Sequence, residues 1–90
     1  MTFQSQPSEQ LKKTLKVLKR KDPTLFAAVK KKMWQIVSLD IKGIEHFKNL
    51  KGGKSHLKRV HISSFVLTFK VKGTTIFFED FSHHDRIYSK

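Results

Sequence analysis

The stretch that decides the fold is LKRVHISSFVLTFKVKGTTIFFEDFS, residues 57–82. It contains three runs rich in apolar and β-branched residues, Leu57–Ile62, Phe65–Val71 and Thr75–Ser82. Only Ser63-Ser64 separates the first two runs, and a short turn beginning at Lys72-Gly73 separates the last two. Turns this short between strand-like runs are typical of consecutive antiparallel hairpins. The sequence therefore predicts a three-strand antiparallel meander.

Two helices are predicted upstream of the meander. From Ser8 to Lys21 leucines recur in one stripe, with lysines over much of the remaining surface. Asp22-Pro23 is a helix restart signal, with Asp as N-cap and Pro at the first helical position, and it predicts a second helix over Pro23–Leu39. A connection this short favours an antiparallel hairpin, and helices so rich in lysine need the sheet to pack on.

The remaining segments complete an α+β fold. Thr2–Gln6 alternates weakly and is expected to form a short edge strand that Pro7 stops. Asp40–Ser55 is expected to be a basic loop, and Trp34 a core residue. We thus predict a single domain over residues 1–90, with an N-terminal two-helix hairpin packed on a twisted antiparallel sheet.

Charge is distributed unevenly along the 90 residues. The formal net charge is +12; residues 1–60 hold 15 Lys and Arg against 4 Asp and Glu, a balance of +11, whereas residues 61–90 hold 4 against 3, a balance of +1. A positive field of this size attracts polyanions, and nucleic acid is the default partner. No apolar run reaches about 18 residues, no secretory signal is visible, and there is no cysteine. We expect a cytoplasmic protein without a membrane anchor.

The chain ends in a polar cluster, His83-His84-Asp85-Arg86-Ile87-Tyr88, whose side chains suit phosphate chemistry. A second candidate surface follows from the period of a strand. If Val60 and Ile62 face the core, then Arg59 and His61 face the opposite side. The residues expected to contact RNA are Lys12, Lys13, Lys16, Lys30, Lys31, Lys32, Lys51, Lys54, Lys58 and His84.

From residue 48 onward the chain resembles the RelE/ParE toxin superfamily of toxin–antitoxin pairs. The family's "K-x-L-K-G" stretch is matched by residues 48–52 and its basic strand by residues 57–61. Its "Y-R-x-x-Y" strand is matched by residues 65–69, and its terminal "H-R-x-x-x-Y" by residues 83–88. The resemblance implies the same α+β architecture and favours the RelE-like branch.

The resemblance also implies roles for site residues. His83 aligns with the terminal-strand histidine and would transfer protons, and Tyr88 would stack on a base or assist acid–base work. Apart from the resemblance, Arg86 lies two residues before Tyr88 and would share its side of an extended segment, where it would clamp a phosphate. Arg59 matches a basic position of the middle strand, and His61 would be a general base if it neighbours His83 across strands. The expected catalytic set is His83, His61, Arg59, Arg86 and Tyr88, with no metal or cofactor.

One departure from the family pattern leaves the function open. Phe65-Val66 stands where the family has "Y-R", so the arginine that stabilises the transition state in nuclease members is missing. Val66 shares a strand face with Thr68 and Lys70, and we expect that polar face to accommodate an arginine.

Three functions remain open on these grounds. The first is a ribosome-dependent messenger-RNA endoribonuclease that acts on ribosome-bound message and is neutralised by an acidic, partly disordered antitoxin. The second is a ParE-like toxin that acts by binding a protein, and the third is a basic RNA-binding module without catalysis.

Overall fold

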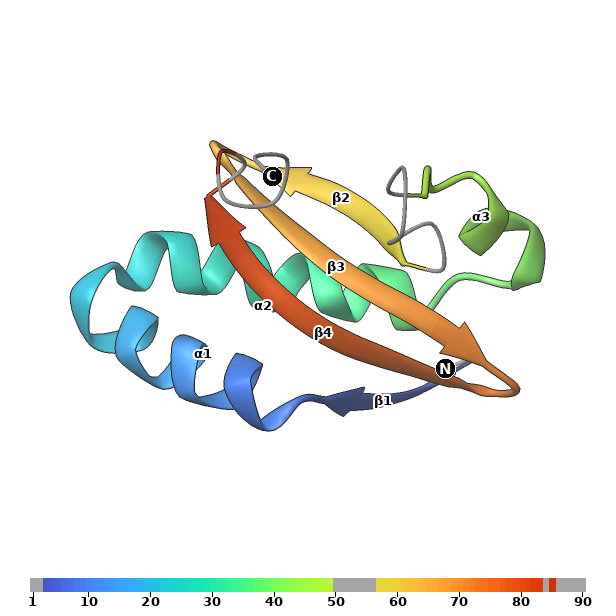
Figure 1. The fold of residues 1–90 in the computed structure, drawn as a ribbon, viewed down its shortest axis with the longest axis horizontal. Coiled ribbons are helices and arrows are strands. Elements are labelled where there is room, and N and C mark those ends of the chain that lie inside the picture. Colours follow the sequence, from blue (N-terminus) through green and yellow to red (C-terminus); the bar gives the residue numbers. More distant parts are fainter. Residues whose placement is uncertain (1–2, 50–56, 84, 86–90) are drawn as a thin grey trace.

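The computed structural model describes residues 3–49, 57–83 and 85. Its elements in chain order are β1 (Gln4–Pro7), α1 (Glu9–Lys21), α2 (Pro23–Val37), α3 (Ile41–Glu45), β2 (Lys58–Ile62), β3 (Phe65–Lys72) and β4 (Thr75–His83). The strands form one sheet in the order β1-β4-β3-β2 (Figure 1). Strands β2, β3 and β4 pair antiparallel in sequence order, which confirms the predicted meander. No helix within the described ranges is long and apolar enough to cross a membrane.

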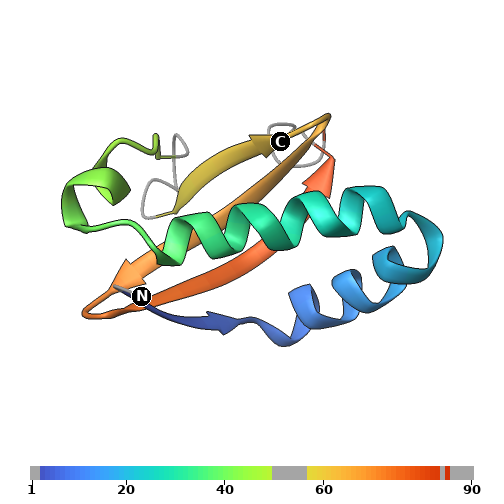
Figure 2. The same ribbon diagram turned by 180° about the vertical axis from the view of Figure 1, so that it is seen from behind.

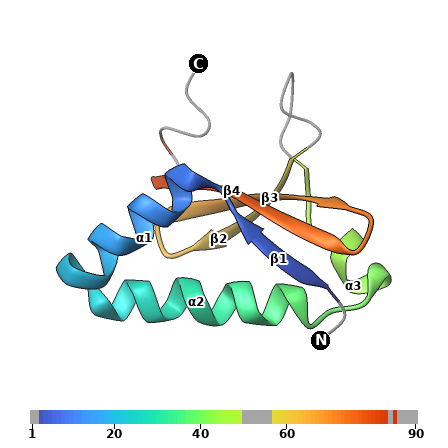
Figure 3. The ribbon, with the colours of Figure 1, turned by 90° about the horizontal axis from the view of Figure 1, so that it is seen from below.

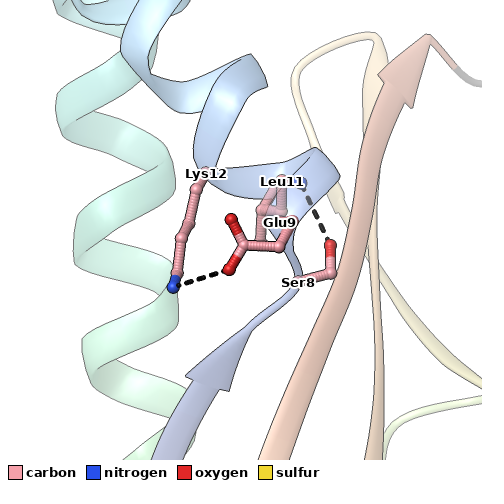
Figure 4. Close-up of polar contacts among 4 residues, drawn as sticks. All are labelled: Ser8, Glu9, Leu11 and Lys12. Atoms are coloured by element: carbon pink, nitrogen blue, oxygen red, sulfur yellow. Dashed lines mark hydrogen bonds and ion pairs between the residues drawn. The ribbon is translucent and has the colours of Figure 1, made fainter.

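Ser8 starts helix α1 and also anchors it to the sheet. Its Oγ accepts a hydrogen bond from the Leu11 N–H at 3.0 Å, as an N-cap does, and donates to the Glu79 carbonyl of β4 at 2.6 Å. In the first turn, Lys12 Nζ lies 3.3 Å from Glu9 Oε2 (Figure 4). The cap therefore fixes where the first helix begins relative to the last strand.

Helix α2 begins at the predicted restart. Asp22 Oδ1 accepts from the Leu25 N–H at 3.1 Å, and Pro23 opens the helix. The two helices form the predicted antiparallel hairpin, and α2 runs across one face of the sheet (Figures 2 and 3). The other face of the sheet carries no described helix (Figure 3).

The hydrophobic core fills the space between α2, the inner side of α1 and one face of the sheet. Phe69 and Phe78 lie at its centre, with ring centroids 5.9 Å apart, and both are fully buried. The helices contribute buried aliphatic side chains at the predicted spacing, namely Leu11, Leu15, Val29, Met33, Ile36 and Val37. The lysine-rich helices are thus held by packing on the sheet, as expected.

The first strand differs from the prediction in its orientation and bounds. β1 pairs parallel to β4, with Gln4 opposite Thr75 and Pro7 opposite Phe78, so the sheet is mixed rather than wholly antiparallel. Pro7 belongs to the strand instead of stopping it. An edge strand tolerates a proline whose missing N–H would face away from the sheet.

Two further expectations were wrong. The segment after α2 is not only a loop, because Asp40 Oδ1 caps a short helix, α3, by accepting from the Gly43 N–H at 2.9 Å. Ile44 of this helix is buried, as expected for a residue that fixes the segment to the body. Trp34 is not a core residue but lies on the outer side of α2 with 61% of its surface exposed. The inner side of α2 is already filled by smaller aliphatic side chains.

The β2–β3 turn contains a strained residue that suggests a stabilising change. Ser63 has φ of 58°, in the left-handed region that glycine adopts without a steric cost, and within the described chain it is the one residue other than glycine with positive φ. We expect Ser63→Gly to raise the free energy of unfolding by about 1 kcal/mol. Ser64→Gly is the matched control and should lower it by roughly 0.5 kcal/mol, since the residue gains only unfolded-state freedom. Urea unfolding of the three proteins measures both changes, and equal effects would contradict the strain.

Candidate functional site

Arg59 and His61 lie on β2, an edge strand, and project from the sheet face opposite α2. Ile62 is buried in the helix-side core and Val60 packs against it, so the two intervening residues face the other way. His61 is exposed and Arg59 is partly exposed. The prediction that Arg59 and His61 face away from the core is therefore confirmed. The surface that they form together with the residues of β3 and β4 that face the same way is called the open sheet face.

The strand register aligns two rows of residues across the open sheet face. Arg59 lies opposite Thr68, which lies opposite Asp80; His61 lies opposite Val66, which lies opposite Ser82. Directly opposed residues of antiparallel strands project to the same side. The basic residues of β2 thus share one surface with the hydroxyl and carboxylate groups of β4.

The middle of this surface is buried, contrary to the sequence-based expectation. Val66 has no exposed surface, and Thr68 retains only 2%. Val66 does not belong to the helix-side core cluster. Lys70 on the same strand face is partly exposed, but Val66 is fully buried. The expectation that this face would accommodate an arginine at position 66 was therefore wrong.

Asp80 organises the β4 side of the open sheet face. One of its carboxylate oxygens accepts from the Phe81 N–H at 2.8 Å, and the other accepts from Ser82 Oγ at 3.2 Å. Thr68 Oγ1 donates to the Asp80 carbonyl at 3.4 Å. Sequence reasoning missed Asp80 and Ser82, although their alternation with the buried Phe81 was a signal that they share a side with Arg59 and His61.

His83 lies on the other side of the sheet from His61. It is opposite Phe65, which is opposite Ile62, and its ring meets the Phe65 ring edge-on at 5.5 Å. Its Nδ1 accepts from the Asp85 N–H at 3.2 Å and lies 3.6 Å from the Asp85 carboxylate. The two histidines therefore do not neighbour one another across strands, and the expected His61–His83 pair is not formed.

The predicted RNA-contacting lysines fall into two groups. Lys13, Lys16, Lys30 and Lys31 are exposed, whereas Lys12 pairs with Glu9, and Lys58 Nζ donates to the Phe47 carbonyl and to Asn49 Oδ1, both at 3.3 Å. Lys32 is partly exposed and lines a groove described below. The remaining predicted site residues lie outside the described residues: Lys51, Lys54, His84, Arg86 and Tyr88.

One known protein is similar to this chain in sequence, and several solved structures are similar to it in fold. A protein of Methanocaldococcus jannaschii named "Putative toxin RelE4" is 42% identical over 83 residues, which are 89% of this chain and 84% of that protein. A scan against models of protein families found no match.

Several solved structures show the same architecture. A mutant of Escherichia coli YafQ superposes with a TM-score of 0.73 at 16% identity, covering 97% of this chain and 99% of that one. A chain of the Mycobacterium tuberculosis RelBE2 toxin–antitoxin complex gives 0.72 at 14% identity, covering 92% and 99%. A chain of the Escherichia coli DinJ–YafQ toxin–antitoxin complex gives 0.65 at 16% identity, covering 99% and 100%.

The two-helix hairpin on a four-strand mixed sheet with a C-terminal meander is the fold of RelE- and YafQ-like toxins from type II toxin–antitoxin pairs. Within that class, the extent of the identity with the Methanocaldococcus protein shows that the chain belongs to the RelE family.

The burial of Val66 leads to a stability prediction. Val66→Arg would place a guanidinium where no exposed surface exists, and we expect it to lower the free energy of unfolding by about 2 kcal/mol or more. Lys70→Arg, on the same strand face but partly exposed, should change it by less than about 0.5 kcal/mol. Chemical denaturation of both variants measures the difference, and a Val66→Arg protein as stable as the wild type would contradict it.

Proposed function

We propose that this RelE-family toxin is an endoribonuclease that cleaves messenger RNA on the ribosome, with Arg59 and His61 acting from the open sheet face. The observation that carries the proposal is the shared orientation of these two side chains on an edge strand, away from the helices. One supplies a permanent positive charge and the other an imidazole that can accept and return a proton. Family membership supports the class of activity.

Cleavage of RNA at such a site needs few groups. The 2′-hydroxyl loses its proton and attacks the adjacent phosphorus, the phosphorane bears added negative charge, and the P–O5′ bond breaks as the 5′-oxygen is protonated. His61 accepts the 2′-hydroxyl proton, and the Arg59 guanidinium stabilises the phosphorane. Tyr88, which matches the terminal tyrosine of the family pattern, and Arg86, two residues before it, are proposed to complete the site by protonating the leaving oxygen and binding phosphate.

The basic surface supplies affinity for RNA without reading its sequence. The exposed lysines of α1 and α2 add a diffuse positive charge to the open sheet face, and charges of this kind hold the phosphate backbone. The same charge favours an acidic antitoxin as the neutralising partner. Relatives of the same fold were crystallised as toxin–antitoxin complexes, which supports this assignment.

A second candidate function is ParE-like inhibition by binding a protein target. The observation that favours it is Val66, which stands at the position of the family arginine and is fully buried. A chain without that arginine has one charge fewer to stabilise the phosphorane. Primer extension on messenger RNA after induced expression separates the two, because discrete cuts in ribosome-bound message occur only with the nuclease.

The site geometry predicts an order of importance among three variants. His61→Ala and Arg59→Ala should each lower the cleavage rate about 10²-fold or more, since each removes a group that acts on the reacting phosphate. His83→Ala should lower it less than about tenfold, because its ring packs on Phe65 from the opposite side of the sheet.

Ribosome-dependent cleavage of a defined message measures all three rates. Ser64→Ala, an exposed neighbour in the β2–β3 turn, is the control. Wild-type rates from both His61→Ala and Arg59→Ala would rule out catalysis from the open sheet face.

RNA affinity should fall steeply with salt. Contact with about six phosphates gives a log–log slope of about −4 for single-stranded RNA. Changing Lys12, Lys13 and Lys16 together to glutamine should make the slope shallower by about 2 and leave the cleavage sites unchanged. The triple arginine variant keeps the charge and should keep the slope. Filter binding across a salt series tests this, and a flat dependence would exclude backbone electrostatics as the main source of affinity.

A further inference from the structure

Trp34 is the chain's one tryptophan, and it stands exposed on α2 beside an apolar groove. The groove has a volume of about 430 Å³ and is lined mainly by Trp34, Ile36, Leu39 and Phe47, with Lys32 among the lining residues. Phe47 follows α3 and packs edge-on against Phe69 of the helix-side core, with ring centroids 5.5 Å apart. The groove therefore belongs to the helical layer, on the other side of the sheet from Arg59 and His61.

The α2 side of the groove is cationic. Lys30 and Lys31 are exposed one turn before Trp34 on α2, so all three side chains lie on one side of the helix. Helix α2 contains no Asp or Glu. A second copy of this chain carries +12 and would be repelled. The charge thus selects an anionic occupant.

Between the two anionic classes, a protein segment fits better than RNA. An RNA base can stack on an indole, but its polar edges would then meet the apolar walls formed by Ile36, Leu39 and Phe47. A groove of this volume has room for a few aliphatic side chains, and tryptophan is among the commonest residues that anchor protein interfaces.

We infer that this groove is the docking site for an acidic amphipathic segment of the antitoxin, with apolar side chains seated against Trp34 and carboxylates facing Lys30 and Lys31. The inference rests on the proposed toxin–antitoxin function and assigns a surface to the partner. It places the partner's anchor on the helical layer and leaves the open sheet face uncovered by this segment.

Trp34 itself reports on the groove. We expect the indole emission to shift to the blue and its quenching by neutral acrylamide to fall several-fold when a tryptophan-free form of the cognate antitoxin is added. An unchanged emission in a complex that forms would overturn the inference. Added ribosomal RNA should leave the emission of the free toxin unchanged; strong quenching by stacking would assign the groove to RNA instead.

Affinity gives an independent test. Trp34→Ala should weaken antitoxin binding at least tenfold, as expected for a central aromatic anchor. Val17→Ala is the matched control, because Val17 is another exposed apolar residue, 42% exposed, on α1. It should change the dissociation constant less than twofold. Thermal unfolding of the free variants checks that each one folds, which the exposure of both side chains favours.

Charge reversal tests the acidic character of the segment. Lys30→Glu with Lys31→Glu should slow association more than tenfold at low salt, whereas Lys13→Glu with Lys16→Glu makes the same change in net charge on α1 and should slow it about threefold or less. Equal effects from the two pairs would mean that only the overall charge matters and would overturn the local assignment.

The outcomes separate this inference from the function on which it rests. If the wild-type chain binds no antitoxin and is harmless when expressed, the toxin–antitoxin function fails. If the wild type binds but Trp34→Ala binds equally well, the function stands and the groove is not the docking site.

Discussion

The structure depends on a central strand, β3, that is buried from both sides. Val66, Leu67, Thr68 and Phe69 are consecutive and all are buried, although a described helix covers only one face of the sheet. Leu67 and Phe69 join the helix-side core, while Val66 and Thr68 close the centre of the opposite face. The neighbouring strands carry further polar groups on that face, with Arg59 and His61 on β2 and Asp80 and Ser82 on β4, and β3 has the partly exposed Lys70 nearer its end. The burial of Val66 and Thr68 thus keeps the charged side chains of that face away from its centre.

The same constraint explains why a missing arginine need not leave the sheet face inert. An arginine at position 66 would have to keep its guanidinium solvated at the centre of the sheet, where this chain instead has a fully buried valine. Arg59 is on the edge strand and reaches the same face with less desolvation, because edge residues have fewer neighbours. A charge on the edge strand costs less free energy to desolvate than a charge at the centre of the sheet. It also stabilises a phosphorane less, because water around the edge screens it more. The chain therefore favours stability over the strongest electrostatic site.

Much of this architecture follows from the sequence, because local signals and packing agree. The Asp22-Pro23 restart, the leucine stripe and the short turns each predict an element that forms. The parallel pairing of β1 was missed because it depends on a contact between the two ends of the chain, which no local pattern records. Trp34 was misplaced for a different reason: size and apolarity favour burial on average, but the inner side of α2 was already filled. The His61–His83 pair was not formed because β3 lies between β2 and β4, and because the strand register places the two histidines on opposite faces of the sheet. The sequence did not predict the second point, since the β3–β4 register is shifted at Thr68/Phe69.

The two proposed surfaces, the groove beside Trp34 and the open sheet face, lie on opposite layers, which limits how a partner could neutralise the toxin. A segment seated beside Trp34 does not reach Arg59 or His61, because the sheet and its core lie between them. Neutralisation then needs either a second segment of the partner that covers the open sheet face, or a bound partner large enough to keep the toxin from entering the ribosome. An anchor remote from the proposed catalytic groups makes no demand on Arg59 or His61. It does use Lys30 and Lys31, which are also proposed to hold RNA, so the segment would compete with RNA on the helical layer while making its apolar contact there. Linking the two surfaces through one flexible partner adds avidity without requiring either contact to be strong.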